Sequence, residues 1–307
     1  MTSGAVVGMQ ILRTDEARFA GLPDYPFSPQ WAEVQDGLHM HYVDEGPRKA
    51  NPVVMIHGEP TWSYLWRHMI PVIANNGYRV LAPDLIGFGK SDKPDNPLDY
   101  TYDRHMQWLT QWMLTLDLRQ VTLVCQNWGS LLGLQLAARH PDRIDRIIVG
   151  NGRLPSGNSH APTGATLWRA FSLYSPWFPI SQLVQLGTER SLSRGELAAY
   201  DAPFPSHAHK SGARGFPRLL PRLPTDHVSE LYRDAWSALE RWRKPFVTCF
   251  SNGDPVTRGA DRDLQRRIPG AHGQPHITLR GGHFLQEDAP LDFARVILDA
   301  CRSVMAA

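Results

Sequence analysis

Apolar residues in this chain fall into two kinds of stretch that alternate along the sequence. Short continuous apolar runs, typical of strands buried on both faces of a sheet, occur at 52–57, 78–82, 121–125, 144–149, 245–251 and 276–279. Other stretches place apolar residues three or four apart, which predicts helices with one buried face, most clearly at Asp103–Leu116. Strands that alternate with helices predict a mostly parallel sheet with helices on both faces.

Three further elements complete the predicted sheet domain. Leu38–Val43 alternates apolar and polar residues, which indicates an early antiparallel strand. We also expect helices at Ser63–Asn75 and Leu291–Val304, the latter with Phe293, Ile297 and Cys301 on one buried stripe. Ligands of such sheets bind beyond the carboxyl ends of the strands, so we expect the functional site there.

The pattern changes between residues 155 and 225, where Pro and Gly are dense and no buried strand is visible. Short helices are predicted at Ala165–Leu173, Ile180–Leu186 and Ser193–Tyr200. Because the strand pattern resumes directly afterwards, we expect an inserted α-helical cap rather than a second independent domain. The predicted division is a sheet domain in two parts, 1–154 and 229–307, with the cap at 155–228.

Charge and composition exclude several classes of protein. The 307 residues carry 32 basic and 30 acidic side chains, a net charge of +2, which argues against a nucleic-acid partner. No stretch of about 18 apolar residues predicts a membrane span, and the N-terminus lacks the pattern of a signal peptide. The three cysteines show no CxxC spacing and indicate reduced thiols in a reducing compartment, so we expect a cytoplasmic protein.

The run 121–125 leads into a polar corner, QNWGS at 126–130, followed by a helical pattern of leucines. A strand, a sharp turn and a helix are how α/β-hydrolases present their nucleophile. The residue at the tip takes a left-handed conformation, which Asn tolerates well. Here the tip is Asn127, and a neutral amide cannot act as the nucleophile.

Five segments together resemble the haloalkane dehalogenases. They are HGEPTWSYLWRHM at 57–69, PDLIGFGKSDKP at 83–94, QNWGS at 126–130, GDPVTRG at 253–259 and GGHFLQEDAP at 281–290. The family elbow reads Q-D-W-G with Asp as the nucleophile, so this chain departs from it at Asn127. The resemblance implies an α/β-hydrolase fold and hydrolysis of a carbon–halogen bond to alcohol and halide through an alkyl-enzyme ester. It implies neither cofactor nor metal.

The order nucleophile, acid, base along an α/β-hydrolase assigns Asp254 as the acid and His283 as the base. Asp254 precedes a proline and would otherwise be a turn-former, and His283 follows two glycines. In some relatives the acid comes after the sixth strand instead, and the residue near that point in this chain is Asn151, which lacks a carboxylate. The resemblance also implies an oxyanion hole made by the backbone N–H groups of Glu59 and Trp128.

A leaving halide needs hydrogen-bond donors in a dry site, and an indole N–H is a donor on a large apolar body. The resemblance makes Trp128 the first donor. The subgroup with Glu at the HGEP position takes its second Trp from the cap, which points to Trp168, with Trp177 as the competitor. Core packing is the alternative role for both cap tryptophans.

Other polar groups predict less. His207 and His209 have no third ligand in view, so we do not expect a metal site there. We expect His39 and His41 at the surface. We also expect a solvated face for the basic series Lys210, Arg214, Arg218 and Arg222.

Three interpretations of Asn127 remain open. It is a deliberate change that arrests the reaction, a natural loss that leaves a non-catalytic small-ligand binder, or an amide that hydrolyses slowly to Asp. The intact Asp254, His283 and tryptophans favour an arrested haloalkane dehalogenase, with a halogenated alkane and halide as its ligands. The rival enzyme is an epoxide hydrolase, which would need cap tyrosines, for which Tyr174 and Tyr200 are the candidates.

Overall fold

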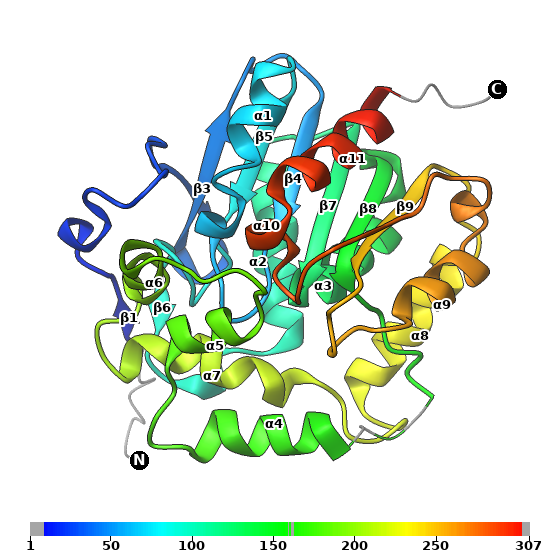
Figure 1. The fold of residues 1–307 in the computed structure, drawn as a ribbon. Coiled ribbons are helices and arrows are strands. Elements are labelled where there is room, and N and C mark those ends of the chain that lie inside the picture. The colour runs from blue at the N-terminus through cyan, green and yellow to red at the C-terminus, as the bar shows by residue number, and fades with distance from the viewer. Residues whose placement is uncertain (1–8, 159, 161–162, 303–307) are drawn as a thin grey trace.

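A computed structural model of the chain describes residues 9–158, 160 and 163–302. Its centre is an eight-stranded sheet in the order β10-β9-β8-β7-β4-β5-β3-β2 (Figure 1). Strands β2 and β3 pair antiparallel, β3 also runs antiparallel to β5, and the other neighbours are parallel. The strands are β2 (Gln30–Val34), β3 (Leu38–Glu45), β4 (Pro52–Ile56), β5 (Arg79–Pro83), β7 (Val121–Asn127), β8 (Ile144–Gly152), β9 (Phe246–Ser251) and β10 (Ile277–Leu279).

Helices cover both faces of this sheet, as the alternation of patterns predicts. Helices α1 (Ile70–Asn75) and α11 (Pro290–Arg302) contact each other on one face. Helices α2 (Tyr102–Thr115), α3 (Trp128–Arg139) and α8 (His227–Leu239) pack together on the other. The α/β-hydrolase architecture is therefore confirmed. The last two residues of the predicted closing helix, 303 and 304, lie outside the described residues.

A helical cap lies across the carboxyl ends of the central strands (Figure 1). Its helices are α4 (Thr163–Tyr174), α5 (Ile180–Leu186), α6 (Arg194–Asp201) and α7 (Ser211–Gly215). Ser193 begins α6 with a reciprocal capping box to Glu196, which satisfies two backbone donors at the helix start. The division of the chain at 155 and 228 stays a prediction.

The structure corrects the predicted helix at Ser63–Asn75. A short 3₁₀ turn at Ser63–Trp66 is followed by a separate helix α1. Pro71 stands in the first turn of α1 and has no N–H to bond back to Arg67, so one continuous helix cannot form. Other elements were not predicted, among them strand β2, helices α7 and α8, and a small antiparallel pair of β1 (Ile11–Leu12) with β6 (Lys93–Pro94).

Two predictions of surface polarity were wrong. His41 is buried, with Nδ1 2.8 Å from Asp84 Oδ2, whereas His39 stays accessible. Of the basic series, Arg214 is buried and donates to the carbonyls of Leu173 and Ser175. All three cysteines are free thiols. Within the described ranges, no helix has the length and apolar character needed to cross a membrane.

Candidate active site

The elbow that presents residue 127 depends on two close backbone approaches. Strand β7 ends at Asn127, which has a φ of 52°, and α3 begins at the next residue. A Cβ at Gly129 would lie 2.1 Å from the Ile56 carbonyl oxygen, so only glycine lets α3 start this close to β4. A Cβ at Gly58 would lie 2.4 Å from Asn127 Oδ1. The two glycines let the turn after β4 and the elbow meet at the side chain of Asn127.

The amide of Asn127 lies between two of the predicted site residues. Its Oδ1 accepts a hydrogen bond from the Glu59 backbone N–H at 3.1 Å, and its Nδ2 lies 2.8 Å from His283 Nε2. An amide NH₂ can only donate, so Nε2 is the acceptor here and the ring proton is on Nδ1. That proton points to Asp254, whose Oδ1 lies 3.0 Å from His283 Nδ1.

Asp254 is a buried carboxylate held in its charged form. It accepts hydrogen bonds from the Val256 N–H at 2.8 Å and from the N–H and hydroxyl groups of Thr257. Burial by itself would raise the pKa of Asp254, but the hydrogen bond from His283, together with those from Val256 and Thr257, outweighs burial and lowers it. The ionised Asp254 can therefore orient His283 and stabilise a positive charge on the ring.

A partly open cavity of about 800 Å³ is lined by Asn127 and His283. Trp128 and Trp168 both line it, and Trp128 packs against Phe216 with ring centroids 4.6 Å apart. The Trp168 indole lies beside the Glu59 side chain and lowers the pKa of its carboxyl group. Trp177 is 66% exposed and is not among the lining residues. Apolar parts of the remaining wall come from leucines of the elbow helix and the cap, namely Leu131, Leu183, Leu186 and Leu220, and the charged residues Arg153 and Glu189 line it as well.

Glu59 is the unusual acid of the cavity. It is 5% exposed, and its Oε1 has no hydrogen-bond partner among the described residues. Burial raises the pKa of Glu59 to about 8, an effect that the Trp168 indole only partly offsets. At neutral pH the carboxyl group is therefore mostly protonated, and the cavity beside Asn127 carries no negative charge from Glu59.

Comparison with known proteins gives the family. The alpha/beta hydrolase fold family matches residues 51–290. The chain is 49% identical over 295 residues to a haloalkane dehalogenase of Psychrobacter cryohalolentis, covering 94% of this chain and 97% of that one. It is 51% identical over 294 residues to haloalkane dehalogenase 1 of Mycobacterium tuberculosis, covering 94% and 98%. The chain belongs to the haloalkane dehalogenases.

Solved haloalkane dehalogenases share the fold over nearly the whole chain. The tetrameric enzyme of Paraglaciecola agarilytica superposes with a TM-score of 0.89 at 33% identity, covering 97% of this chain and all of that one. The enzyme of Agrobacterium tumefaciens gives a TM-score of 0.76 at 29% identity, covering 89% and 96%.

Two amides of this haloalkane dehalogenase hold the backbone at His283, the predicted base, and their part was missed in the sequence. Asn151 Nδ2 donates to the carbonyls of Gly282 and His283 at 2.8 and 3.0 Å, and Gln126 Nε2 donates to the His283 carbonyl at 3.1 Å. Asn151 was considered only as a failed acid. The sequence does place Asn151 at the carboxyl end of a buried strand. A buried amide there needs hydrogen-bond partners, which would have pointed to backbone groups nearby.

Proposed function

We propose that this chain is a haloalkane dehalogenase whose reaction runs through position 127, and that with Asn there it binds substrate and halide without turnover. The observation that supports this is the position of the Asn127 amide, which contacts both the Glu59 N–H and Nε2 of His283. A carboxylate in the same place would have an oxyanion donor on one side and a base on the other.

With a carboxylate at 127, the reaction has two steps. One carboxylate oxygen attacks the carbon that bears the halogen, the carbon–halogen bond breaks, and halide leaves with the electron pair. His283 then takes a proton from water as the water attacks the carbonyl carbon of the ester. The developing oxyanion is stabilised by the backbone N–H groups of Glu59 and Trp128. As this intermediate collapses, the bond from its carbon to the alkoxy oxygen breaks, the alkoxide leaves as the alcohol with the proton held by His283, and the carboxyl group at 127 loses its proton to solvent. No step needs a cofactor or a metal.

For the halide we assign the indole N–H groups of Trp128 and Trp168. Both indoles border the cavity beside Asn127, and Trp177 does not. The leucines that line the cavity beside Asn127 favour a halogenated alkane over a charged substrate there, because a buried, unpaired charge is costly to desolvate.

An epoxide hydrolase fits less well. That reaction needs a tyrosine hydroxyl in the cavity to protonate the epoxide oxygen. Tyr174 is 81% exposed, and the hydroxyl of Tyr200 donates to Glu287 instead. Neither tyrosine lines the cavity.

The test is the substitution Asn127→Asp, measured as bromide release from a short terminal bromoalkane. Loss of a covalent nucleophile costs on the order of 10⁶-fold in a serine protease, so we expect the substitution to raise the rate by at least about 10³-fold. The exposed Asn158 offers a matched control, because Asn158→Asp makes the same chemical change away from the cavity and should leave the activity at background.

Activity measurements on the unaltered protein can contradict the assignment of residue 127 as the nucleophile position. Full activity of a fresh preparation with unchanged intact mass would show that residue 127 is not the nucleophile position. Activity that grows during storage, with the mass rising by about one dalton, would mean that the amide hydrolyses to the acid, and the assignment would stand. Halide binding without any activity in the Asn127→Asp protein would instead identify a non-catalytic binder.

A further inference from the structure

Two segments from different parts of the chain lie side by side next to the base. We name residues 187–190, which link α5 to α6, the cap strap, and residues 281–284, which carry His283, the base loop. The Phe284 N–H donates to the Gly187 carbonyl at 3.0 Å. A Cβ at Gly282 would lie 2.5 Å from the Gly187 oxygen, and a Cβ at Gly187 would lie 2.6 Å from the Phe284 ring. Glycines in both segments therefore permit this contact.

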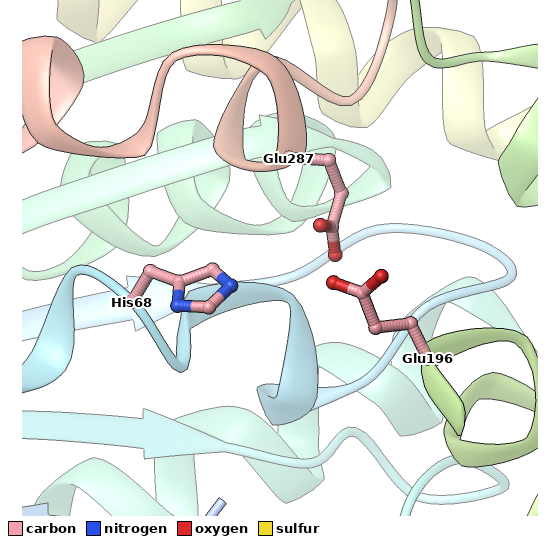
Figure 2. Close-up of side chains that lie close together, drawn as sticks. All are labelled: His68, Glu196 and Glu287. Carbon is pink, nitrogen blue, oxygen red and sulfur yellow. The ribbon is translucent and has the colours of Figure 1, made fainter. Parts of the chain in front are cut away.

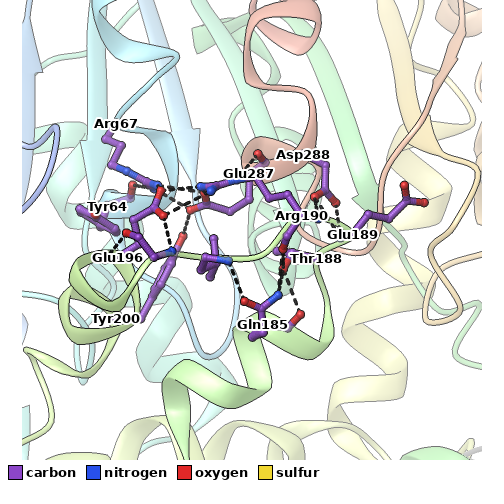
Figure 3. Close-up of polar contacts among 12 residues, drawn as sticks. Tyr64, Arg67, Gln185, Thr188, Glu189, Arg190, Glu196, Tyr200, Glu287 and Asp288 are labelled. Carbon is purple, nitrogen blue, oxygen red and sulfur yellow. Dashed lines mark hydrogen bonds and ion pairs between the residues drawn. The ribbon is translucent and has the colours of Figure 1, made fainter.

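One carboxylate joins the two segments. Asp288, the last residue of α10 (Leu285–Asp288), accepts the N–H of Glu189 at 3.0 Å and the N–H of Arg190 at 2.9 Å, both in the cap strap (Figure 3). Its Oδ2 also accepts the N–H of Gly282 in the base loop at 2.7 Å. Three backbone donors from two segments thus share one side chain.

A buried network of ion pairs fixes the cap strap through its residue Arg190. Glu287 lies next to Asp288 and is bound by Arg67, by Tyr200 and by Arg190 of the strap (Figure 3). The Arg190 Nε donates to the Glu287 carbonyl at 2.7 Å. Because Arg67 and Glu287 are almost fully buried, separating one partner would leave an uncompensated charge.

The same network includes a group of possible metal ligands. His68, Glu196 and Glu287 bring ligand atoms within 4.8 Å of one another (Figure 2). Both carboxylates, however, already pair with the guanidinium groups of Arg67 and Arg190. Two fixed positive charges beside the acids disfavour a cation, so we treat this cluster as part of the ion-pair network.

We propose that Asp288 is a positioning residue for the base: it couples the cap strap to the base loop and thereby holds His283 toward residue 127. On the sheet side, Gln126 and Asn151 hold the His283 carbonyl. On the cap side, Asp288 and the strap hold the residues before and after His283. The inference rests on the proposed function, in which His283 acts only in ester hydrolysis.

Because His283 acts only in ester hydrolysis, loss of Asp288 should slow that step and leave the first step unchanged. Attack on the halogenated carbon needs the nucleophile and the halide donors, whereas ester hydrolysis also needs an aligned base. A displacement of about 1 Å can cost about 100-fold in rate. In the Asn127→Asp protein, Asp288→Ala should therefore slow ester hydrolysis by about 10- to 100-fold and leave the initial burst of halide unchanged.

The experiment follows both steps in a single turnover, with halide release for the first and the alkyl adduct by intact mass for the second. Asp288→Asn keeps one acceptor oxygen and should give an intermediate effect. The matched control is Asp292→Asn, since Asp292 is exposed on α11 and pairs with the exposed Arg295.

A second measurement does not depend on activity. In the unaltered protein, Asp288→Ala should speed amide hydrogen exchange at Gly282 and Phe284, while Asp292→Asn should not. Unchanged exchange, or burst and hydrolysis that fall together, would overturn the positioning role of Asp288. Absence of any halide burst in the Asn127→Asp parent would instead overturn the proposed function, and the exchange result would still decide whether Asp288 couples the two segments.

Discussion

Glu59 should make the stability of this protein fall as pH rises, and Glu59→Gln should remove that part of the pH dependence. The pKa of Glu59 is raised from 4.5 to about 8 by burial. Above pH 4.5 the carboxyl group ionises in the unfolded chain but stays protonated in the folded one. Ionisation thus stabilises the unfolded state until the folded group ionises near pH 8, and the full cost is reached above that value.

The size of the effect follows from the two pKa values. They differ by about 3.5 pH units, and at 1.36 kcal/mol per unit this corresponds to about 5 kcal/mol at high pH. Between pH 5 and pH 9, linkage gives a change of about 4 kcal/mol. We therefore expect Glu59→Gln to gain about 4 kcal/mol in unfolding free energy relative to the parent over this range.

Urea unfolding at pH 5, 6, 7, 8 and 9 measures this difference directly, because all other titrating groups are common to both proteins. Glu33→Gln is the matched control, since Glu33 is exposed on β2 and its curve should run parallel to that of the parent. If the curve of Glu59→Gln also runs parallel to that of the parent, Glu59 is solvated or paired in solution and the reasoning from its burial is wrong.

Two further variants test the assigned roles. Trp168→Phe removes a donor to the halide, and because a hydrogen bond to a charged group contributes about 1.5–3 kcal/mol, bromide quenching of tryptophan fluorescence should require at least tenfold more bromide. Trp177→Phe should leave this affinity unchanged, and the reverse result would move the second donor to Trp177. His283→Phe in the Asn127→Asp protein should release one equivalent of halide and retain one alkyl adduct by intact mass. Normal steady turnover would remove His283 from its role.

The sequence predicts most of the sheet because its parallel strands are buried on both faces and read as unbroken apolar runs. The same logic fails at the sheet edge. Strand β2 has only a weak alternation and is fixed by pairing with β3. His41 looks like a surface residue in an alternating strand, yet the Ser91 hydroxyl and Asp84 bind it from the loop that follows β5. Such burial depends on a distant segment that local periodicity does not encode.

Some residues of the candidate site could likewise be predicted from the sequence, and others could not. Asn127, Asp254 and His283 stand in motifs with a fixed chain order, so their positions in the sequence were sufficient to group them. Asp288 lies only a few residues beyond His283, but its role depends on the position of the cap strap. Its partners there, Glu189 and Arg190, lie 99 and 98 positions earlier in the chain. No local pattern specifies that contact.

The exchange of a carboxylate for an amide at position 127 leaves the shape of the site almost unchanged but alters its proton count. With Asn127, the His283 ring is neutral, because Nε2 accepts from the amide and Nδ1 donates to Asp254. With a carboxylate there, the ring would lie between two acids, and only an imidazolium donates from both nitrogens. Alkylation would then turn the carboxylate at 127 into a neutral ester, which no longer holds the second proton. The ring can then accept a proton from the attacking water in the second step, whereas the amide at 127 gives the first step no nucleophile.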